Sequence, residues 1–230
     1  MTAQLLSLAM FIQALEIFWL TRKASFFEIW SDQNLSNEKW LISQKALKIV
    51  SLVQIVAACA GMVSPQLSFF IILFFTHLLI CMRFRGIFNG GSDMMTFVVL
   101  TGVIISLFGS DIGMVYIAVH TIYSYFKAGL AKVIHKEWRN GTALSAFFET
   151  SLFADIRSMK GNKILNWIVI IFELGIILLP FFPQLLWFYF AGAMIFHLIN
   201  YYYFGLNRFF WIWLSAWPAV FYSVKLFSRI

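Results

Sequence analysis

The feature that most constrains this chain is a series of long apolar segments separated by short breaks. A helix needs about 20 residues to cross the hydrocarbon core of a bilayer. Apolar runs that would be too long are interrupted at Pro65, at residues 109–111 and at Pro180 with Pro183. The resulting predicted spans are residues 3–20, 46–63, 66–83, 93–109, 112–131, 164–182, 184–203 and 207–226. We therefore predict an all-α, polytopic transmembrane helical bundle of about eight spans.

The composition agrees with a membrane protein. Hydrophobic residues make up 61% of the chain and charged residues 12%, whereas a soluble domain carries about 25% charged residues. The spans and their connections use nearly all of the sequence, so residues 1–230 are predicted to form a single integral membrane domain. The first segment lacks a basic start and carries Gln13 and Glu16, so we expect it to remain as the first helix. Function is expected within the membrane or at its surface.

The distribution of basic residues predicts the orientation. Connections 63–66, 109–111 and 181–184 contain no Lys or Arg. The alternate connections are flanked by basic residues: Arg22, Lys23, Lys39, Lys45, Lys48, Arg83, Arg85, Lys132, Lys136, Arg139, Arg157, Lys160, Lys163 and Arg208. The positive-inside rule makes this face cytoplasmic, in a bacterial inner membrane, although Lys225 and Arg229 break the pattern. The same loops account for the net charge of +7, so we expect membrane lipids and no nucleic acid as partners.

Two polar connections are predicted to form interfacial helices on the cytoplasmic side. Residues 24–44 mix Phe and Trp with charged side chains. In residues 132–162, large apolar residues such as Trp138, Phe147 and Phe148 recur at roughly helical spacing between polar residues. Such amphipathic helices lie at the headgroup level of a bilayer.

The stretch from Tyr123 to Phe148 is the predicted functional edge of the chain. An apolar helix ends there in a dense group of polar and basic residues. Gly129, in the last turn, would let another helix or a ligand come close. Lys132 follows it and could reach back along the helix.

Four pieces of sequence in this part of the chain resemble one known family. They are AGLAK, W and NGTAL at 128–144, RFRGIFNGGSDMMTF at 83–97, FELGIILLP at 172–180 and FHLINYYYFGLNRF at 196–209. Together, from about residue 83 to 220, they resemble the HTTM family, the membrane domain shared with vitamin K-dependent gamma-carboxylases. The resemblance implies the helical membrane fold more firmly than a reaction.

The resemblance also implies a role for one residue. In the carboxylases a lysine in the segment that resembles AGLAK is the catalytic base that works with reduced vitamin K, and Lys132 matches it. Those enzymes also use a histidine where this chain has Gly91 or Ser92. The chain also lacks their large lumenal domain, so gamma-carboxylation itself is not expected.

Ionisable residues inside predicted spans are costly and face a partner or a cavity. Here they are Glu16, His77, His120, Glu173 and His197, and the last four fall near mid-membrane. Glu173 could pair with His120 or His197, and such a set could pass protons to a quinol or bind a polar head group. The alternative is that each histidine donates to a carbonyl of a neighbouring helix.

Tyr116, His120, Tyr123 and Lys127 fall on one face of the predicted helix 112–131. This face could be the wall of a polar pocket. It could equally be an ordinary stripe between helices.

A turn with two glycines precedes the fourth span. Asn89, Gly91 and Asp93 belong to it, and a glycine-rich turn at a helix N-terminus could receive an anionic group or simply cap the helix. Arg83 and Arg85 stand close in sequence and could hold a lipid phosphate. As cytoplasmic basic residues, they are also explained without a ligand.

No metal site is predicted. The sequence has no HxxxH or CxxC spacing, and a metal enzyme built from His77, His120 and His197 is disfavoured. Cys59 and Cys81 fall at different depths of neighbouring spans, too far apart for a disulfide, so both are expected to be reduced packing residues.

Two functions from different classes remain. The favoured one is a non-catalytic or accessory subunit of a membrane protein complex, because no extramembrane catalytic domain is present and aromatic residues reach 19%. The alternative is a membrane enzyme or maturation factor acting on a lipid-soluble or membrane-inserted substrate. In that case Lys132 would lie at the mouth of the site, with Glu173 and His197 inside and quinone or lipid as the bound cofactor.

Overall fold

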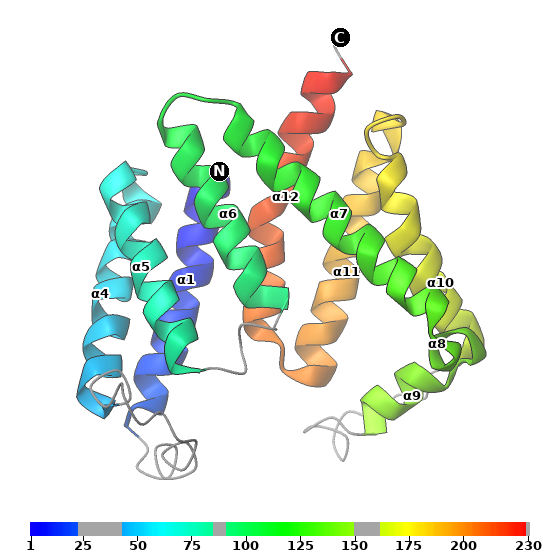
Figure 1. Cartoon of the computed structure of the whole chain (residues 1–230), viewed down its shortest axis with the longest axis horizontal. Coiled ribbons are helices and arrows are strands. Elements are labelled where there is room, and N and C mark those ends of the chain that lie inside the picture. The colour runs from blue at the N-terminus through cyan, green and yellow to red at the C-terminus, as the bar shows by residue number, and fades with distance from the viewer. Residues whose placement is uncertain (23–42, 85–90, 150–161, 229–230) are drawn as a thin grey trace. The chain divides into compact units, whose positions relative to one another are not determined.

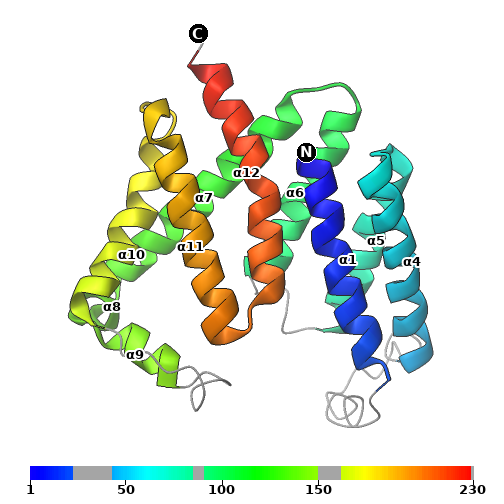
Figure 2. The same cartoon turned by 180° about the vertical axis from the view of Figure 1, so that it is seen from behind.

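The structure is a computed structural model that describes residues 1–22, 43–84, 91–149 and 162–228. These residues form helices and contain no strand, so the predicted all-helical fold is confirmed (Figure 1, Figure 2). The α-helices are α1 (Thr2–Leu20), α4 (Gln44–Val63), α5 (Leu67–Arg83), α6 (Gly91–Leu107), α7 (Ile112–Ile134), α8 (Lys136–Asn140), α9 (Thr142–Glu149), α10 (Lys163–Gly175), α11 (Leu186–Phe204) and α12 (Asn207–Phe227). Two 3₁₀ helices, η2 (Ile176–Leu178) and η3 (Pro183–Leu185), lie between α10 and α11.

Seven of the eight predicted spans coincide with an α-helix to within a few residues, and the span 164–182 is formed by α10 and η2. The predicted breaks lie between α-helices. Ser64 and Pro65 separate α4 from α5, and Gly109 takes a positive φ of 84° between α6 and α7. Within the part of the chain that the structure describes, three helices are by length and composition long and apolar enough to cross a membrane: Thr2–Leu20, Gln44–Val63 and Pro183–Phe204. Helices α5 and α6 are shorter apolar helices. The helical segments are therefore confirmed, while the number of eight crossings stays a prediction.

The chain divides into two compact units, Met1–Gly113 and Met114–Ile230. In the first unit α1 packs on α4, α4 on α5, α5 on α6, and α6 on α1, which closes a group of four helices (Figure 2). Its apolar core includes Leu6, Met10 and Phe70. Cys81 is buried there and Cys59 is exposed, with no disulfide between them, as predicted.

The second unit holds the C-terminal helices. Helices α8 and α9 follow α7 and pack on α10, and α11 packs on α12. Gly141 has a φ of 95° at the corner between α8 and α9. The Asn166 amide fixes this corner by donating to the carbonyl oxygen of Trp138 at 2.9 Å.

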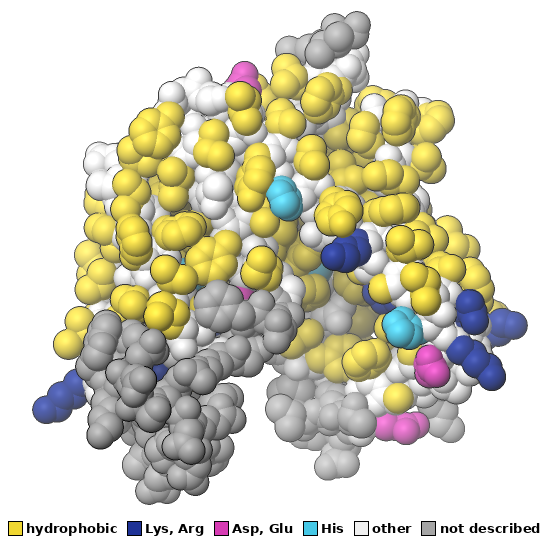
Figure 3. All heavy atoms as spheres, viewed as in Figure 1, with side chains coloured by type: hydrophobic (Ala, Val, Ile, Leu, Met, Phe, Trp, Pro, Cys, Tyr) yellow, Lys and Arg dark blue, Asp and Glu magenta, His cyan; other side chains and the backbone are white. Residues whose placement is uncertain are grey.

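Part of the predicted interfacial structure can be compared with these helices. Residues 136–149 form the short helices α8 and α9 after α7, whereas residues 150–161 and most of the connection 24–44 lie outside the described residues. Charged side chains gather over α8, and hydrophobic side chains cover much of the rest of the visible face (Figure 3). Large apolar residues such as Val56, Phe75 and Trp187 are exposed, as expected of helices that face lipid.

Gly129 brings α7 close to α10. A Cβ atom at this position would lie 2.9 Å from the backbone nitrogen of Leu174 and 3.0 Å from the Cβ of Glu173. Real Cβ atoms are not found that close to a backbone nitrogen, so only glycine permits this approach. The sequence predicted that Gly129 would admit a helix or a ligand, and it admits a helix.

Replacing Gly129 with leucine tests this contact. The Gly129→Leu protein should lose about 1–3 kcal/mol of unfolding free energy, because overpacking forces the helices apart. Ala131→Leu is the matched control, since it adds the same side chain at an exposed position of the same helix. Thermal unfolding in detergent, followed by circular dichroism, measures both. Equal melting temperatures for the two variants would contradict the close approach.

Candidate functional site

A buried ion pair joins α7 to α10 in the second unit. The Lys132 ammonium donates to both carboxylate oxygens of Glu173, with Nζ–Oε1 and Nζ–Oε2 distances of 2.8 and 2.7 Å. Glu173 is 2% exposed and the Lys132 side chain 15%. Burial of a carboxylate requires a charged or hydrogen-bonding partner. Lys132 provides both a charge and two hydrogen bonds.

The partner of Glu173 is neither histidine that the sequence suggested. A pair with His120 or His197 was one possibility, whereas the structure pairs Glu173 with Lys132. The reason lies one turn earlier in α7, where Gly129 packs directly on the Cβ of Glu173. The flexible lysine stem then spans the remaining distance to the carboxylate.

A cavity of about 410 Å³ lies beside this ion pair. Its lining is apolar except for the ends of Lys132 and Asn200. The apolar part consists of Trp138, Leu144, Phe147, Phe148, Leu165, Val169, Phe196, Ile199, Phe204 and Leu206. The Lys132 ammonium also lies 4.9 Å from the centre of the Trp138 ring, within the range of a cation–π contact. The site therefore combines one partly accessible cation with a large apolar surface.

His197 forms a second buried polar group in this unit. It is 0% exposed, and its Nε2 lies 2.5 Å from the hydroxyl oxygen of buried Tyr125. The imidazole stacks on Trp213, with ring centres 5.1 Å apart. Its Nδ1 has no hydrogen-bond partner among the described residues. His197 lies between Phe196 and Asn200 on α11, and both of these residues line the cavity.

The other predicted residues of α7 lie away from the cavity. His120 is half-buried against Tyr116, with ring centres 4.5 Å apart. Tyr123 is 53% exposed, and the Lys127 ammonium lies 5.9 Å from its ring centre. None of these residues lines the cavity beside Lys132. The predicted polar face is therefore not the wall of this cavity, because α7 turns Tyr125 and Gly129 inward instead.

The predicted anion-binding residues belong to the first unit or cannot be compared. Asn89 and Arg85 lie outside the described residues. Gly91 is exposed at the start of α6, whereas Asp93, in the first turn of that helix, is fully buried. Arg83, in the last turn of α5, is also buried.

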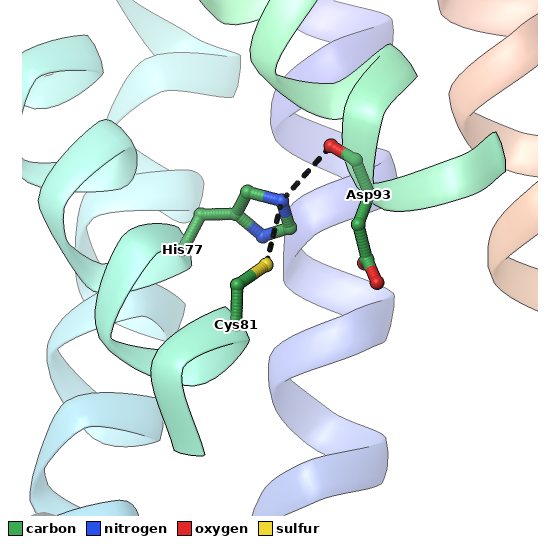
Figure 4. Close-up of side chains that lie close together, drawn as sticks. All are labelled: His77, Cys81 and Asp93. Carbon is green, nitrogen blue, oxygen red and sulfur yellow. Dashed lines mark hydrogen bonds between the residues drawn. The ribbon is translucent and has the colours of Figure 1, made fainter. Parts of the chain in front are cut away.

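Asp93 lies in a buried polar cluster that sequence reasoning missed. His77 and Cys81 face it from α5, and all three side chains are 0% exposed (Figure 4). His77 Nε2 lies 3.5 Å from Cys81 Sγ and 3.4 Å from the backbone oxygen of Asp93. The spacing of His77 and Cys81, four residues apart on one helix face, was a visible signal.

The ion pair predicts a strong dependence of stability on both partners. Lys132→Ala should lower the unfolding free energy by about 3–5 kcal/mol, because it leaves the Glu173 carboxylate buried without a counter-charge. The double variant Lys132→Met with Glu173→Leu should recover most of that loss, since neither charge remains. Chemical unfolding in detergent micelles measures these changes. Lys127→Ala, at an exposed position of the same helix, is the control, and a loss no larger than this control shows would contradict the buried pair.

The Lys132–Glu173 pair and its cavity are thus the candidate site, with Tyr125 and His197 nearby on α7 and α11. The site is amphipathic, because one charged group borders an otherwise apolar space. No family model, curated protein or solved structure matches the chain.

Proposed function

We propose that this chain is an integral membrane protein that binds a lipid-soluble ligand, a quinone or a lipid, in the cavity beside Lys132. The single observation that carries the proposal is the position of the Lys132–Glu173 pair at the edge of an apolar cavity of about 410 Å³. Sites for small molecules commonly enclose about 300–1,000 Å³, with few polar groups among apolar walls. A ligand with a polar head and an apolar body fits this combination.

The ion pair supports a specific mode of binding. A lysine ammonium has three donors, and two of them point to the Glu173 oxygens. The third can donate to a carbonyl, hydroxyl or phosphate oxygen of a ligand. The rings of Trp138, Phe147 and Phe148 offer flat apolar surfaces for the body of the ligand.

The same pair supports the proposed membrane enzyme or maturation factor of HTTM type. A base needs a neutral amine, and Glu173 can take one proton from Lys132 and leave both groups neutral. The neutral amine could then accept the proton of a quinol hydroxyl, so that the net transfer runs from quinol to Glu173. Under the same proposal, quinol is the cosubstrate and Lys132 the base.

A second candidate is the accessory subunit of a membrane complex. It is favoured by a group of exposed aromatic residues around η3 and the start of α11, namely Phe181, Phe182, Trp187 and Phe188. Aromatic side chains of this size are typical anchors of protein interfaces.

Ligand analysis of the purified chain tests the proposal. The protein purified in mild detergent should carry close to one quinone or lipid molecule per chain. Solvent extraction followed by mass spectrometry measures this content. Val169→Trp should remove this ligand, because Val169 lines the cavity and the indole would fill it. Ile168→Trp is the control, since its neighbour Ile168 is 57% exposed and does not line the cavity.

Two outcomes would contradict ligand binding at this site. One is a wild-type protein without a lipid-soluble ligand. The other is equal ligand content in the Val169→Trp and Ile168→Trp proteins. If other proteins also copurify in fixed proportion with a chain that carries no ligand, the accessory-subunit function replaces the first proposal.

The proposed topology has eight crossings, with the basic connections on the cytoplasmic side of a bacterial inner membrane. A fluorescent protein fused after Gly141 or Gly205 should then fold and fluoresce in the cytoplasm. Fusions after Ser64, Ser110 and Phe182 should be active as periplasmic phosphatases, because these connections lie across the membrane. Phosphatase activity after Gly141, or fluorescence after Ser110, would reject this topology.

A further inference from the structure

The first unit, Met1–Gly113, buries three side chains of types that bind metal ions. His77 and Cys81 come from α5 and Asp93 from the first turn of α6. The ligand atoms that these residues can offer all lie within 4.8 Å of one another. In Figure 4, dashed lines join His77 Nε2 to the thiol of Cys81 and to the backbone oxygen of Asp93. We propose that these three side chains bind a divalent transition-metal ion of the zinc type.

The His77–Cys81 distance already fits such an ion, and the Asp93 carboxylate, within 4.8 Å of both ligand atoms, would have to move closer to complete the site. With about 2.0–2.1 Å from zinc to nitrogen and about 2.3 Å to sulfur, the two ligand atoms of a tetrahedral site are about 3.5 Å apart. His77 Nε2 and Cys81 Sγ are 3.5 Å apart. Imidazole, thiolate and carboxylate are all common zinc ligands, and three of them leave the fourth position for water.

Gln13 orients the imidazole for this role. Its side-chain amide nitrogen lies 3.5 Å from His77 Nδ1. Once the amide is turned by 180° about its last bond, its oxygen accepts the Nδ1 proton, which leaves the lone pair of Nε2 for a metal ion. A second hydrogen bond of this kind is the usual support of a metal-binding histidine. Gln13 is itself buried on α1, so the support comes from a third helix.

Metal binding would take the proton from Cys81 and place a thiolate beside the Asp93 carboxylate. These two negative charges alone would be costly in the interior of an apolar helix group. A divalent ion neutralises both. The metal-free alternative keeps Cys81 as a thiol and lets His77 Nε2 donate to the backbone oxygen of Asp93, 3.4 Å away.

Cobalt binding separates the two alternatives. The purified full chain, stripped with a chelator, should take up one equivalent of Co²⁺ and develop the thiolate-to-cobalt charge-transfer band and the intense visible bands of a tetrahedral site. Zn²⁺ should displace the cobalt and raise the melting temperature, because it binds the folded state. Cys59→Ser is the matched control and should keep these bands, since Cys59 is exposed and lies outside the cluster. Cys81→Ser should lose the charge-transfer band.

A second measurement does not depend on the folding of the Cys81→Ser variant. In the Cys59→Ser protein Cys81 is the only cysteine left, and stoichiometric Zn²⁺ should slow its reaction with a thiol reagent in mild denaturant at least tenfold. Absence of the charge-transfer band in the wild-type protein would overturn the proposal. So would an alkylation rate that Zn²⁺ leaves unchanged, or a cobalt spectrum that persists in a folded Cys81→Ser protein.

Discussion

Buried polar side chains on apolar helices are the constraint on which this structure depends. When the surroundings of a helix are as apolar as its neighbours, apolar burial alone does not specify which helices pack together. A polar group that leaves water, by contrast, needs a partner with defined geometry. Gln54 meets this need by donating to the backbone oxygen of Met10, and thereby joins α4 to α1. Lys132 and Glu173 do the same for α7 and α10, with two charges in place of one amide.

The helices could be predicted well because their limits are set locally. The predicted span 207–226 is observed as Asn207–Phe227, and 112–131 begins at Ile112 as expected. The span 164–182 is the exception, since α10 ends at Gly175 and continues as 3₁₀ helix. Pro180 explains the change, because its ring clashes with the carbonyl four residues earlier and it has no N–H to donate. The predicted span includes Pro180, whereas the α-helix ends one turn before it.

The partners within the candidate site could not be predicted, because they depend on distances between helices. The sequence placed Lys132 at the end of an apolar helix and Glu173 within another, and it identified Gly129 as a point of close approach. It did not indicate that Gly129 would contact the Cβ of Glu173, which brings the lysine rather than a histidine within reach. Likewise, His77 and Cys81 share a visible helical spacing, but Asp93 reaches them only through the packing of α6 on α5.

The two polar sites differ in access, and this difference separates their proposed roles. Lys132 keeps 15% of its side chain exposed and borders a cavity, so a ligand can arrive and leave while the helices stay in place. His77, Cys81 and Asp93 have no exposed surface. A metal ion there could enter only before the four helices close or while they are partly open, and its binding energy would then contribute to folding. The first unit would therefore use its ion for structure, whereas the second would exchange its ligand during function.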